Sequence, residues 1–294
     1  MQQAAKLRDL LNSGKLVIAP GCYDGITARA VERAGFPALY MTGAGTAATA
    51  GFPDYGLVTM TEMVANAGRI TAVAKVPLIA DADTGYGNEL NVVRTVREYA
   101  RLGVAAIHIE DQGFPKRCGH LDNKEIVPLD DYIAKIRAAA DAKPDPDFIL
   151  IARTDSRAGH GLEEAIRRAN AALEAGADIA FVEAPQSMDE VAAVPRQVKG
   201  PCLLNVVAGG KTPHVDLRDV ERMGYALAIV PGLLMKTIVG ACESVLQELK
   251  ETHAHPRIPG DMTVREFFRR VGADEWEPLR ERYRTPPRKA DAAE

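Results

Sequence analysis

The segment Phe114–Glu125, with the sequence FPKRCGHLDNKE, places two cations, a thiol and an imidazole within five positions. Lys116, Cys118 and His120 are residue types that exchange protons, and positive charge of this density can attract an anion. Such a cluster is compatible with catalysis on a loop. The alternative interpretation is that Cys118 is an ordinary surface residue.

Polar residues follow most of the short apolar runs in this chain. They are Asp24, Thr42, Gly43, Asp81, Asp83, Glu110, Asp111, Arg153, Asp155, Glu183 and Asn205. If the runs are strands of a parallel barrel, these residues lie on the face where barrel enzymes hold their active sites. Desolvated carboxylates need a cation or several donors, so several acids at one face favour a bound metal. Oxygen ligands suit Mg²⁺ or Mn²⁺ better than zinc.

A single acid after a strand has a simpler interpretation, because such a carboxylate often caps the next helix. This alternative stays open for Asp24 and Asp155. In the sequence DAD, however, the period-two alternation of a strand puts Asp81 and Asp83 on the same side. Two like charges at that spacing need a cation beside them.

The elements that must position these residues follow a regular pattern. Eight apolar runs begin at Lys15, Ala38, Val76, Ala105, Phe148, Ile179, Pro201 and Tyr225. Between them, segments such as 88–103, 129–142 and 161–176 have apolar residues at i, i+3 and i+4, which predicts helices. Strands that are apolar on both faces suit a (β/α)8 TIM barrel, and a doubly wound open sheet is the competing interpretation.

The barrel is expected to occupy residues 1–250, and the pattern changes after it. Residues 251–294 are expected to form a linker and a C-terminal helical segment. Within that segment, residues 262–283 form one or two helices, and residues 284–294 are a frayed tail.

Composition excludes several classes of protein. The chain has 294 residues, 47% of them hydrophobic, and a formal net charge of -4 without a basic cluster, which argues against nucleic-acid binding. No apolar run approaches the roughly 20 residues that cross a bilayer, and the start lacks a signal-peptide core, so a cytoplasmic protein is expected. The four cysteines are too widely spaced for a zinc cluster or a disulfide framework, and Cys202 and Cys242 are expected to pack in apolar surroundings.

The strand ends also restrict the chemistry. No lysine ends any predicted strand, so an imine-forming aldolase lacks its nucleophile. A divalent cation is then the expected electron sink. Its ligand is expected to be a small anionic 2-hydroxy or 2-oxo acid, with Arg153 holding a second carboxylate in a bidentate fork.

Five strings, in their order along the chain, resemble the isocitrate lyase and phosphoenolpyruvate mutase superfamily. They are DADTGYG at Asp81, IHIEDQ at Ile107, PKRCGH at Pro115, IARTD at Ile151 and FVEA at Phe181. The similarity spans approximately residues 5–250. The sequence KRCGH is typical of the branch that breaks carbon–carbon bonds, which includes 2-methylisocitrate and 2,3-dimethylmalate lyases.

The resemblance implies functional roles position by position. It implies metal binding for Asp81, Asp83 and Glu110, catalytic roles for Cys118, Lys116, His120, Tyr40 and Asp54, and substrate binding for Thr42, Gly43, Ala44, Gly119, Arg153, Glu183 and Asn205. It further implies a homotetramer in which the C-terminal helices cross to a neighbouring subunit.

The implied activity is a Mg²⁺-dependent cleavage of a 2-hydroxy di- or tricarboxylate into pyruvate and a simple carboxylate such as succinate or propionate. Cys118 on a closing loop then protonates the carbanion, and Lys116, Arg117 and His120 are expected to keep its thiolate accessible near neutral pH. Hydrolysis or decarboxylation of oxaloacetate is the alternative activity, and a non-catalytic dicarboxylate-binding barrel is the alternative class.

Two further segments have more than one interpretation. The sequence NVVAGGKTP from Asn205 departs from the TEFG continuation usual in 2-methylisocitrate lyases, which favours alkylmalates or oxaloacetate as substrates. Within it, residues 209–213 form either a phosphate-binding loop or a flexible turn. His108, inside a predicted strand, is expected to be a satisfied interior group rather than a ligand.

Overall fold

Eight parallel strands form a closed barrel in the computed structural model, which describes residues 2–121, 123–258, 260 and 262–285. The strands are β1 (Val17–Cys22), β2 (Leu39–Met41), β3 (Leu78–Asp81), β4 (Ala106–Glu110), β5 (Ile149–Thr154), β6 (Ile179–Val182), β7 (Cys202–Asn205) and β8 (Leu227–Val230). Each strand pairs with the next, and β1 pairs with β8, with Val17 opposite Leu227. The predicted TIM barrel is therefore confirmed, and the open sheet is excluded.

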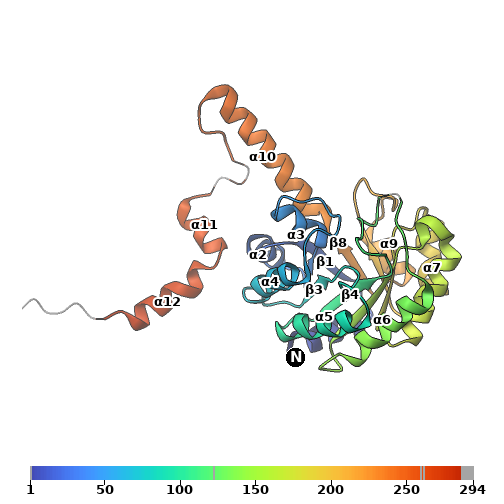
Figure 1. The fold of residues 1–294 in the computed structure, drawn as a ribbon. Coiled ribbons are helices and arrows are strands. Elements are labelled where there is room, and N and C mark those ends of the chain that lie inside the picture. Colours follow the sequence, from blue (N-terminus) through green and yellow to red (C-terminus); the bar gives the residue numbers. More distant parts are fainter. Residues whose placement is uncertain (1, 122, 259, 261, 286–294) are drawn as a thin grey trace, which may run out of the picture. The chain divides into compact units, whose positions relative to one another are not determined.

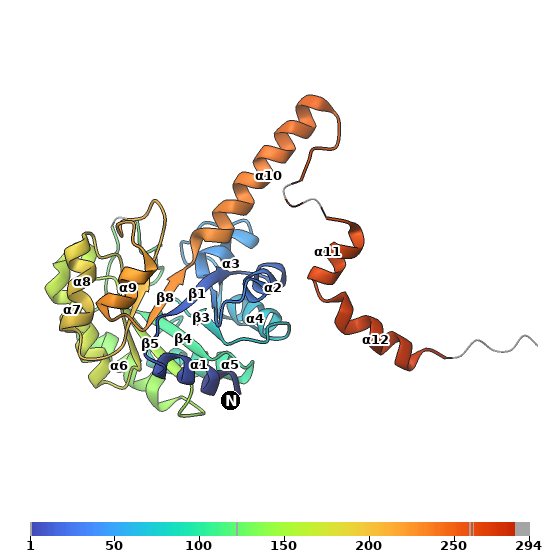
Figure 2. The same ribbon diagram turned by 180° about the vertical axis from the view of Figure 1, so that it is seen from behind.

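Helices connect the strands and cover the outside of the barrel (Figures 1 and 2). They are α1 (Gln2–Asn12), α2 (Gly25–Arg33), α3 (Gly43–Thr49), α4 (Met60–Thr71), α5 (Glu89–Arg101), α6 (Leu129–Asp141), α7 (Arg157–Glu174), α8 (Met188–Gln197) and α9 (Leu217–Met223), and α10 (Gly232–Thr252) follows the last strand. Asp24 caps α2 by accepting from the backbone N–H of Thr27, as the simpler interpretation of that acid predicted. Asp155 instead accepts hydrogen bonds from Arg153.

Apolar side chains fill the barrel where the strands begin. Val17, Ile79, Ile149, Ile179 and Leu227 are each at most 3% exposed and pack together inside the closed sheet. A second apolar layer packs between the strands and the helices. Strands buried on both faces need mostly apolar residues, so the polar residues gather where the strands end, with His108 in the middle of β4 as an exception.

The chain divides into two compact units, residues 1–242 and 243–294. The second unit contains α11 (Val264–Arg270) and α12 (Ala273–Tyr283), which confirms two helices in the predicted segment. Residues 286–294 of the predicted tail lie outside the described residues. No helix in the described part of the chain is long and apolar enough to cross a membrane.

One prediction about the cysteines was wrong. Cys202 is buried in β7, as expected, but Cys242 is exposed on α10. The apolar sequence neighbours of Cys242 suggested burial, but α10 has no buried residue along its length.

Candidate active site

A cavity of about 260 Å³ lies at the carboxyl ends of the strands. The predicted residues that line it are Tyr40, Thr42, Ala44, Asp54, Asp81, Cys118, Gly119, His120, Arg153, Glu183 and Asn205. The remaining predicted residues, Gly43, Asp83, Glu110 and Lys116, contact members of this group. Residues far apart in the sequence thus meet in one place, because most of them lie at the carboxyl end of a strand. Asp54 instead follows α3, and residues 116–120 lie in the loop after β4.

Asp81 and Asp83 are buried side by side at the end of β3. The backbone N–H groups of Gly43 and Asp83 donate to Asp81, at 3.1 Å to Oδ2 and 3.0 Å to Oδ1. Burial raises the pKa of Asp81, but His108, Lys116 and Arg153 outweigh it and lower that pKa to about 2. Burial raises the pKa of Asp83 to about 6, although Lys116 opposes the shift. The two acids therefore differ in how readily they hold a proton.

Lys116 supplies the positive charge that this acidic pair needs. Its Nζ lies 2.8 Å from Oδ1 of Asp83 and 2.5 Å from Oδ1 of Asp54, and the residue is 3% exposed. Burial opposes the charged form, but Asp83 and Asp54 raise the pKa of Lys116 well above its ordinary value. The lysine of the KRCGH segment is therefore fixed as a cation among the acids.

The carboxylate oxygens at the cavity are of the type that binds a divalent cation. Both carboxylate oxygens of Glu110 are buried without a hydrogen bond in the described chain, and Mg²⁺ prefers oxygen ligands of this type. Within the described residues, no three acidic, histidine or cysteine side chains are close enough to ligate one ion. Instead Lys116 pairs with Asp83, and Arg153 Nε lies 3.3 Å from Glu110 Oε2. Burial raises the pKa of Glu110 well above its ordinary value, so this acid needs more positive charge to ionise.

Arg153 does not offer the free fork that the sequence predicted. Its Nε and one terminal nitrogen donate to the two oxygens of Asp155, at 2.8 and 3.0 Å. The guanidinium lies 5.2 Å from the ring centroid of Phe181, a cation–π distance, and 3.6 Å from a Glu183 oxygen. Asp155, two residues further along, takes the bidentate contact and fixes the orientation of Arg153.

Residues 116–121, called the Cys118 segment below, pack against Arg153 and Glu183 at the cavity. A Cβ at Gly119 would collide with Glu183 and Arg153, so glycine allows the backbone to approach them. The Lys211 N–H donates to His120 Nδ1 at 3.0 Å, which leaves Nε2 facing Glu183 at 3.4 Å. The Gly209–Gly210–Lys211 turn therefore contacts a side chain of the candidate site.

The protonation of Cys118 differs from the prediction. Burial raises the pKa of Cys118 above its ordinary value, and this outweighs the backbone hydrogen bond from His120 that lowers it. Lys116 and Arg153 do not reverse this shift, because each is already paired with a buried acid, Asp83 and Asp155 respectively. The thiol is thus held in its protonated form.

His108 is an interior group, as predicted. It is fully buried in β4, its Nε2 lies 2.8 Å from the Tyr40 hydroxyl, and its ring stacks on Tyr40. Burial lowers the pKa of His108, although the nearby Asp81 raises it. The histidine therefore orients the Tyr40 hydroxyl at the cavity.

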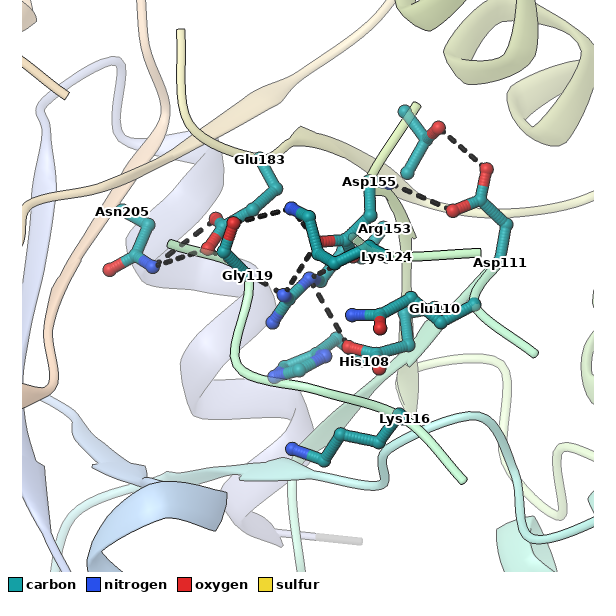
Figure 3. A network of polar contacts seen from close by, with 12 residues as sticks. His108, Glu110, Asp111, Lys116, Gly119, Lys124, Arg153, Asp155, Glu183 and Asn205 are labelled. Atoms are coloured by element: carbon teal, nitrogen blue, oxygen red, sulfur yellow. Dashed lines mark hydrogen bonds and ion pairs between the residues drawn. The ribbon is translucent and has the colours of Figure 1, made fainter. Parts of the chain in front are cut away.

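Sequence reasoning missed two parts of the site. Lys124 donates to Asp155 (Figure 3). Behind this pair, Asp111 contacts Thr154 and Arg168. Nothing in the sequence signals Lys124, because a lysine in a polar loop is ordinarily solvated. Val207 and Met235 also line the cavity and were not foreseen.

Essentially every characterised TIM-barrel enzyme holds its active site at the carboxyl ends of the strands, and this chain has the barrel and gathers its buried ionisable groups there. A family model described as phosphoenolpyruvate phosphomutase matches residues 7–250, and the chain belongs to this family. It is 44% identical to 2,3-dimethylmalate lyase from Eubacterium barkeri, over 97% of this chain and 99% of that protein. It is 42% identical to 2-methylisocitrate lyase from Aeropyrum pernix, over 92% and 88% of the two chains.

Solved structures give a consistent result. A crystal structure of 2,3-dimethylmalate lyase, a member of the PEP mutase/isocitrate lyase superfamily, matches with a TM-score of 0.91 at 42% identity, covering 96% of each chain. Oxaloacetate acetylhydrolase bound to 3,3-difluorooxalacetate matches with a TM-score of 0.91 at 38% identity, covering 95% of this chain and 96% of the other. Phosphonopyruvate hydrolase bound to oxalate and Mg²⁺ matches with a TM-score of 0.87 at 30% identity, covering 96% and 99%. The superfamily suggested by the five strings is confirmed.

Proposed function

We propose that this chain cleaves a carbon–carbon bond of a 2-hydroxy di- or tricarboxylate, of the 2,3-dimethylmalate or 2-methylisocitrate type. The products are pyruvate and a simple carboxylate. The observation that carries the proposal is the buried approach of Gly119 to Arg153 and Glu183, with the adjacent Cys118 at a small, charged cavity. The 44% identity with 2,3-dimethylmalate lyase over nearly the whole chain supports it.

Asp81, Asp83 and Glu110 would hold a Mg²⁺ ion, with Mn²⁺ as a substitute. The buried Glu110 oxygens, which accept no hydrogen bond in the described chain, support this assignment, as does Mg²⁺ in the related phosphonopyruvate hydrolase. When bound, the ion supplies Lewis-acid stabilisation for the oxygens of the developing 2-oxo acid. Lys116 keeps Asp83 ionised and ready to serve as a ligand.

The residues of the chain handle two protons in this reaction. A carboxylate at the cavity wall, for which Asp54 is well situated, takes the proton of the substrate hydroxyl. The C2–C3 bond then breaks, C2 becomes the ketone of pyruvate, and the electron pair stays on C3. The Cys118 thiol gives its proton to C3 and completes the second product. Its raised pKa supports this acid role, because the thiol stays protonated at neutral pH.

Arg153, Glu183 and Asn205 would bind the departing half. The Asn205 amide donates to both Glu183 oxygens at 3.2 Å, so these two side chains are held together. Arg153 adds positive charge where the carboxylate-stabilised carbanion forms. A closed Cys118 segment excludes water, which would otherwise compete as proton source.

Oxaloacetate hydrolysis to oxalate and acetate is the second candidate. The structural match to oxaloacetate acetylhydrolase, at a TM-score of 0.91, supports it as strongly as the fold supports a lyase. A panel of alkylmalates, 2-methylisocitrate and oxaloacetate, with product analysis, separates the two. Pyruvate from an alkylmalate supports the lyase, whereas oxalate from oxaloacetate without any alkylmalate cleavage contradicts it.

Several finer points stay predictions. They are the homotetramer, exchange of the C-terminal helices, a cytoplasmic location and the domain boundary at residue 250. The substrate is also open to measurement. Residues 207–210 read VAGG where 2-methylisocitrate lyases usually have TEFG, so the acidic and aromatic side chains of that sequence are missing here. Alkylmalates are therefore expected to compete well with 2-methylisocitrate in the panel.

A further inference from the structure

Lys124 is a buried lysine that has no role in the proposed reaction. It follows the KRCGH sequence by four residues, and its side chain is 2% exposed. Its Nζ lies 2.7 Å from Oδ1 of Asp155 and also donates to the backbone carbonyl of Gly119. The ammonium group of Lys124 therefore links Gly119, in the Cys118 segment, to Asp155, in the barrel (Figure 3).

The acceptor of Lys124 is a rigid part of the barrel. Asp155 is 1% exposed, and its backbone N–H donates to Asp111 at 2.8 Å. Asp111 is held in turn by Arg168 at 3.1 Å and by the Thr154 hydroxyl at 2.6 Å. A carboxylate fixed by so many donors does not follow the movement of a loop.

Asp155 is shared between Lys124 and Arg153. The carboxylate accepts two hydrogen bonds from Arg153 and one from Lys124. The position of the Cys118 segment and the orientation of Arg153 are thus linked through one side chain. A loop that closes with Lys124 in place also meets Arg153 in its binding orientation.

We infer that Lys124 is a positioning residue that holds the Cys118 segment closed over the cavity and joins its closure to Arg153. This inference rests on the proposed function, in which Cys118 must reach the substrate. The physical basis is the cost of burying an ammonium group, which is recovered only while Asp155 and Gly119 accept from it. An open segment exposes Lys124 to water and loses both contacts.

The test replaces Lys124 by methionine, which keeps most of the length of the side chain and removes its charge. Lys143 provides a matched control, because it forms a 3.0 Å ion pair with Asp178, away from the cavity, and is 16% exposed. The readout is the alkylation rate of Cys118 by iodoacetamide in ligand-free protein, followed by peptide mass spectrometry. Lys124→Met is expected to raise this rate by about tenfold or more, because the closed segment opens more often. Lys143→Met is expected to leave it unchanged.

Kinetics with the best substrate of the panel gives a second readout. Lys124→Met is expected to lower kcat by about tenfold or more, because Cys118 is misplaced in the transition state, with a smaller change in KM. A purely structural ion pair would lower the amount of folded enzyme and leave kcat per folded molecule as it was. Wild-type alkylation and wild-type kcat in Lys124→Met would overturn the inference.

If Lys124→Met fails to fold, a measurement on the wild-type protein still tests the inference. Lysines are labelled by reductive methylation with and without oxalate and Mg²⁺, and oxalate binding is checked by thermal shift. Lys124 is expected to lose reactivity when the ligand closes the segment, and Lys143 to keep its own. Protection of Cys118 without protection of Lys124 would overturn the inference. Absence of both oxalate binding and lyase activity would instead contradict the proposed function, while the ligand-free alkylation result still decides the role of Lys124.

Discussion

The same barrel is apolar at one end of its strands and charged at the other. Where the strands begin, Ile79, Ile149 and Ile179 fill the interior and need no particular partner. Where they end, Glu110 and Arg153 are buried almost as deeply, at 0% and 6% exposure. Burying a charge costs free energy that pairing recovers only in part. We therefore expect the charged end to serve the proposed reaction and the apolar end to stabilise the fold.

Two lysine–aspartate pairs make the difference concrete. Lys143 and Asp178 lie 3.0 Å apart with side chains 16% and 19% exposed, so both remain partly hydrated. Lys124 and Asp155 lie 2.7 Å apart with side chains 2% and 0% exposed. A partly hydrated pair contributes little and can be lost at small cost, but a buried pair leaves an unpaired charge when one partner is removed. Depth of burial, rather than the ion pair itself, decides the effect.

The largest expected effect is loss of the metal. A chelator is expected to abolish cleavage, and Mg²⁺ or Mn²⁺ to restore it, because the acids at the cavity would hold the electron sink of the reaction. The fold should persist, since Lys116 and Arg153 still neutralise Asp83 and Glu110. Turnover and circular dichroism measured before and after chelation check both statements. Full activity of metal-free protein would contradict the metal assignment.

The next largest effect is expected for Glu110→Gln, which tests whether a buried acid at the charged end of the barrel affects turnover rather than stability. Burial raises the pKa of Glu110, and neither carboxylate oxygen accepts a hydrogen bond in the described chain, although Arg153 Nε lies 3.3 Å from Oε2. A neutral amide of the same size should therefore fit without loss of stability. Turnover should fall by about 10²-fold or more, because a metal ligand is lost. Chemical unfolding and kcat are measured on one preparation. A large loss of stability with normal turnover would show that Glu110 serves the fold.

Ile149→Ala provides the opposite case at the apolar end. Ile149 is 1% exposed in the barrel interior, and its truncation leaves a cavity. Such changes typically cost about 2–5 kcal/mol in the free energy of unfolding. Turnover per folded molecule should stay close to the wild-type value, because the cavity lies away from the charged residues. A loss of turnover without a loss of stability would break the comparison between the two ends.

The smallest effect concerns pH. Burial raises the pKa of Cys118, so the closed protein holds this proton more tightly than an exposed thiol, whose pKa is about 8.5. Turnover that needs the thiol should be constant through neutral pH and fall only as pH rises through the raised pKa. The stability contributed by this raised pKa is present below the pKa of the unfolded thiol and is lost as pH rises through the folded value. Alkylation needs the thiolate and should show the opposite slope, half-maximal above the pKa of a free thiol. A Cys118 alkylation profile centred below neutral pH would contradict this.

Much of the fold could be predicted because local patterns carry it. Runs that are apolar at every position, such as 149–152, suit strands buried on both faces, and eight of them fit a closed barrel. The acids at the cavity could be found for the same reason, since a charged residue that ends such a run lies at the rim of the barrel. The helix cap at Asp24 could also be suggested from the sequence, because it depends only on neighbouring residues.

The pairing of the charges could not be predicted, because it depends on contacts between distant segments. Lys116 pairs with Asp54, 62 positions earlier, and Lys124 with Asp155, 31 positions later. The pKa of Cys118 was misjudged because sequence neighbours show nearby cations but not their burial or their partners. Cys242 was misjudged because apolar neighbours on a helix do not establish that the helix is covered.

The most direct test of the proposed mechanism is Cys118→Ser. A serine hydroxyl is close in size to the thiol but has a much higher pKa, so oxalate binding with Mg²⁺ and the unfolding temperature should both be retained. Turnover should fall by about 10²–10⁴-fold, the usual contribution of general acid catalysis. The measurement is a single-turnover rate with the best substrate, under conditions in which chemistry limits the rate. A Cys118→Ser enzyme with the wild-type rate would contradict the proton-donor role and leave the segment with a closing function alone.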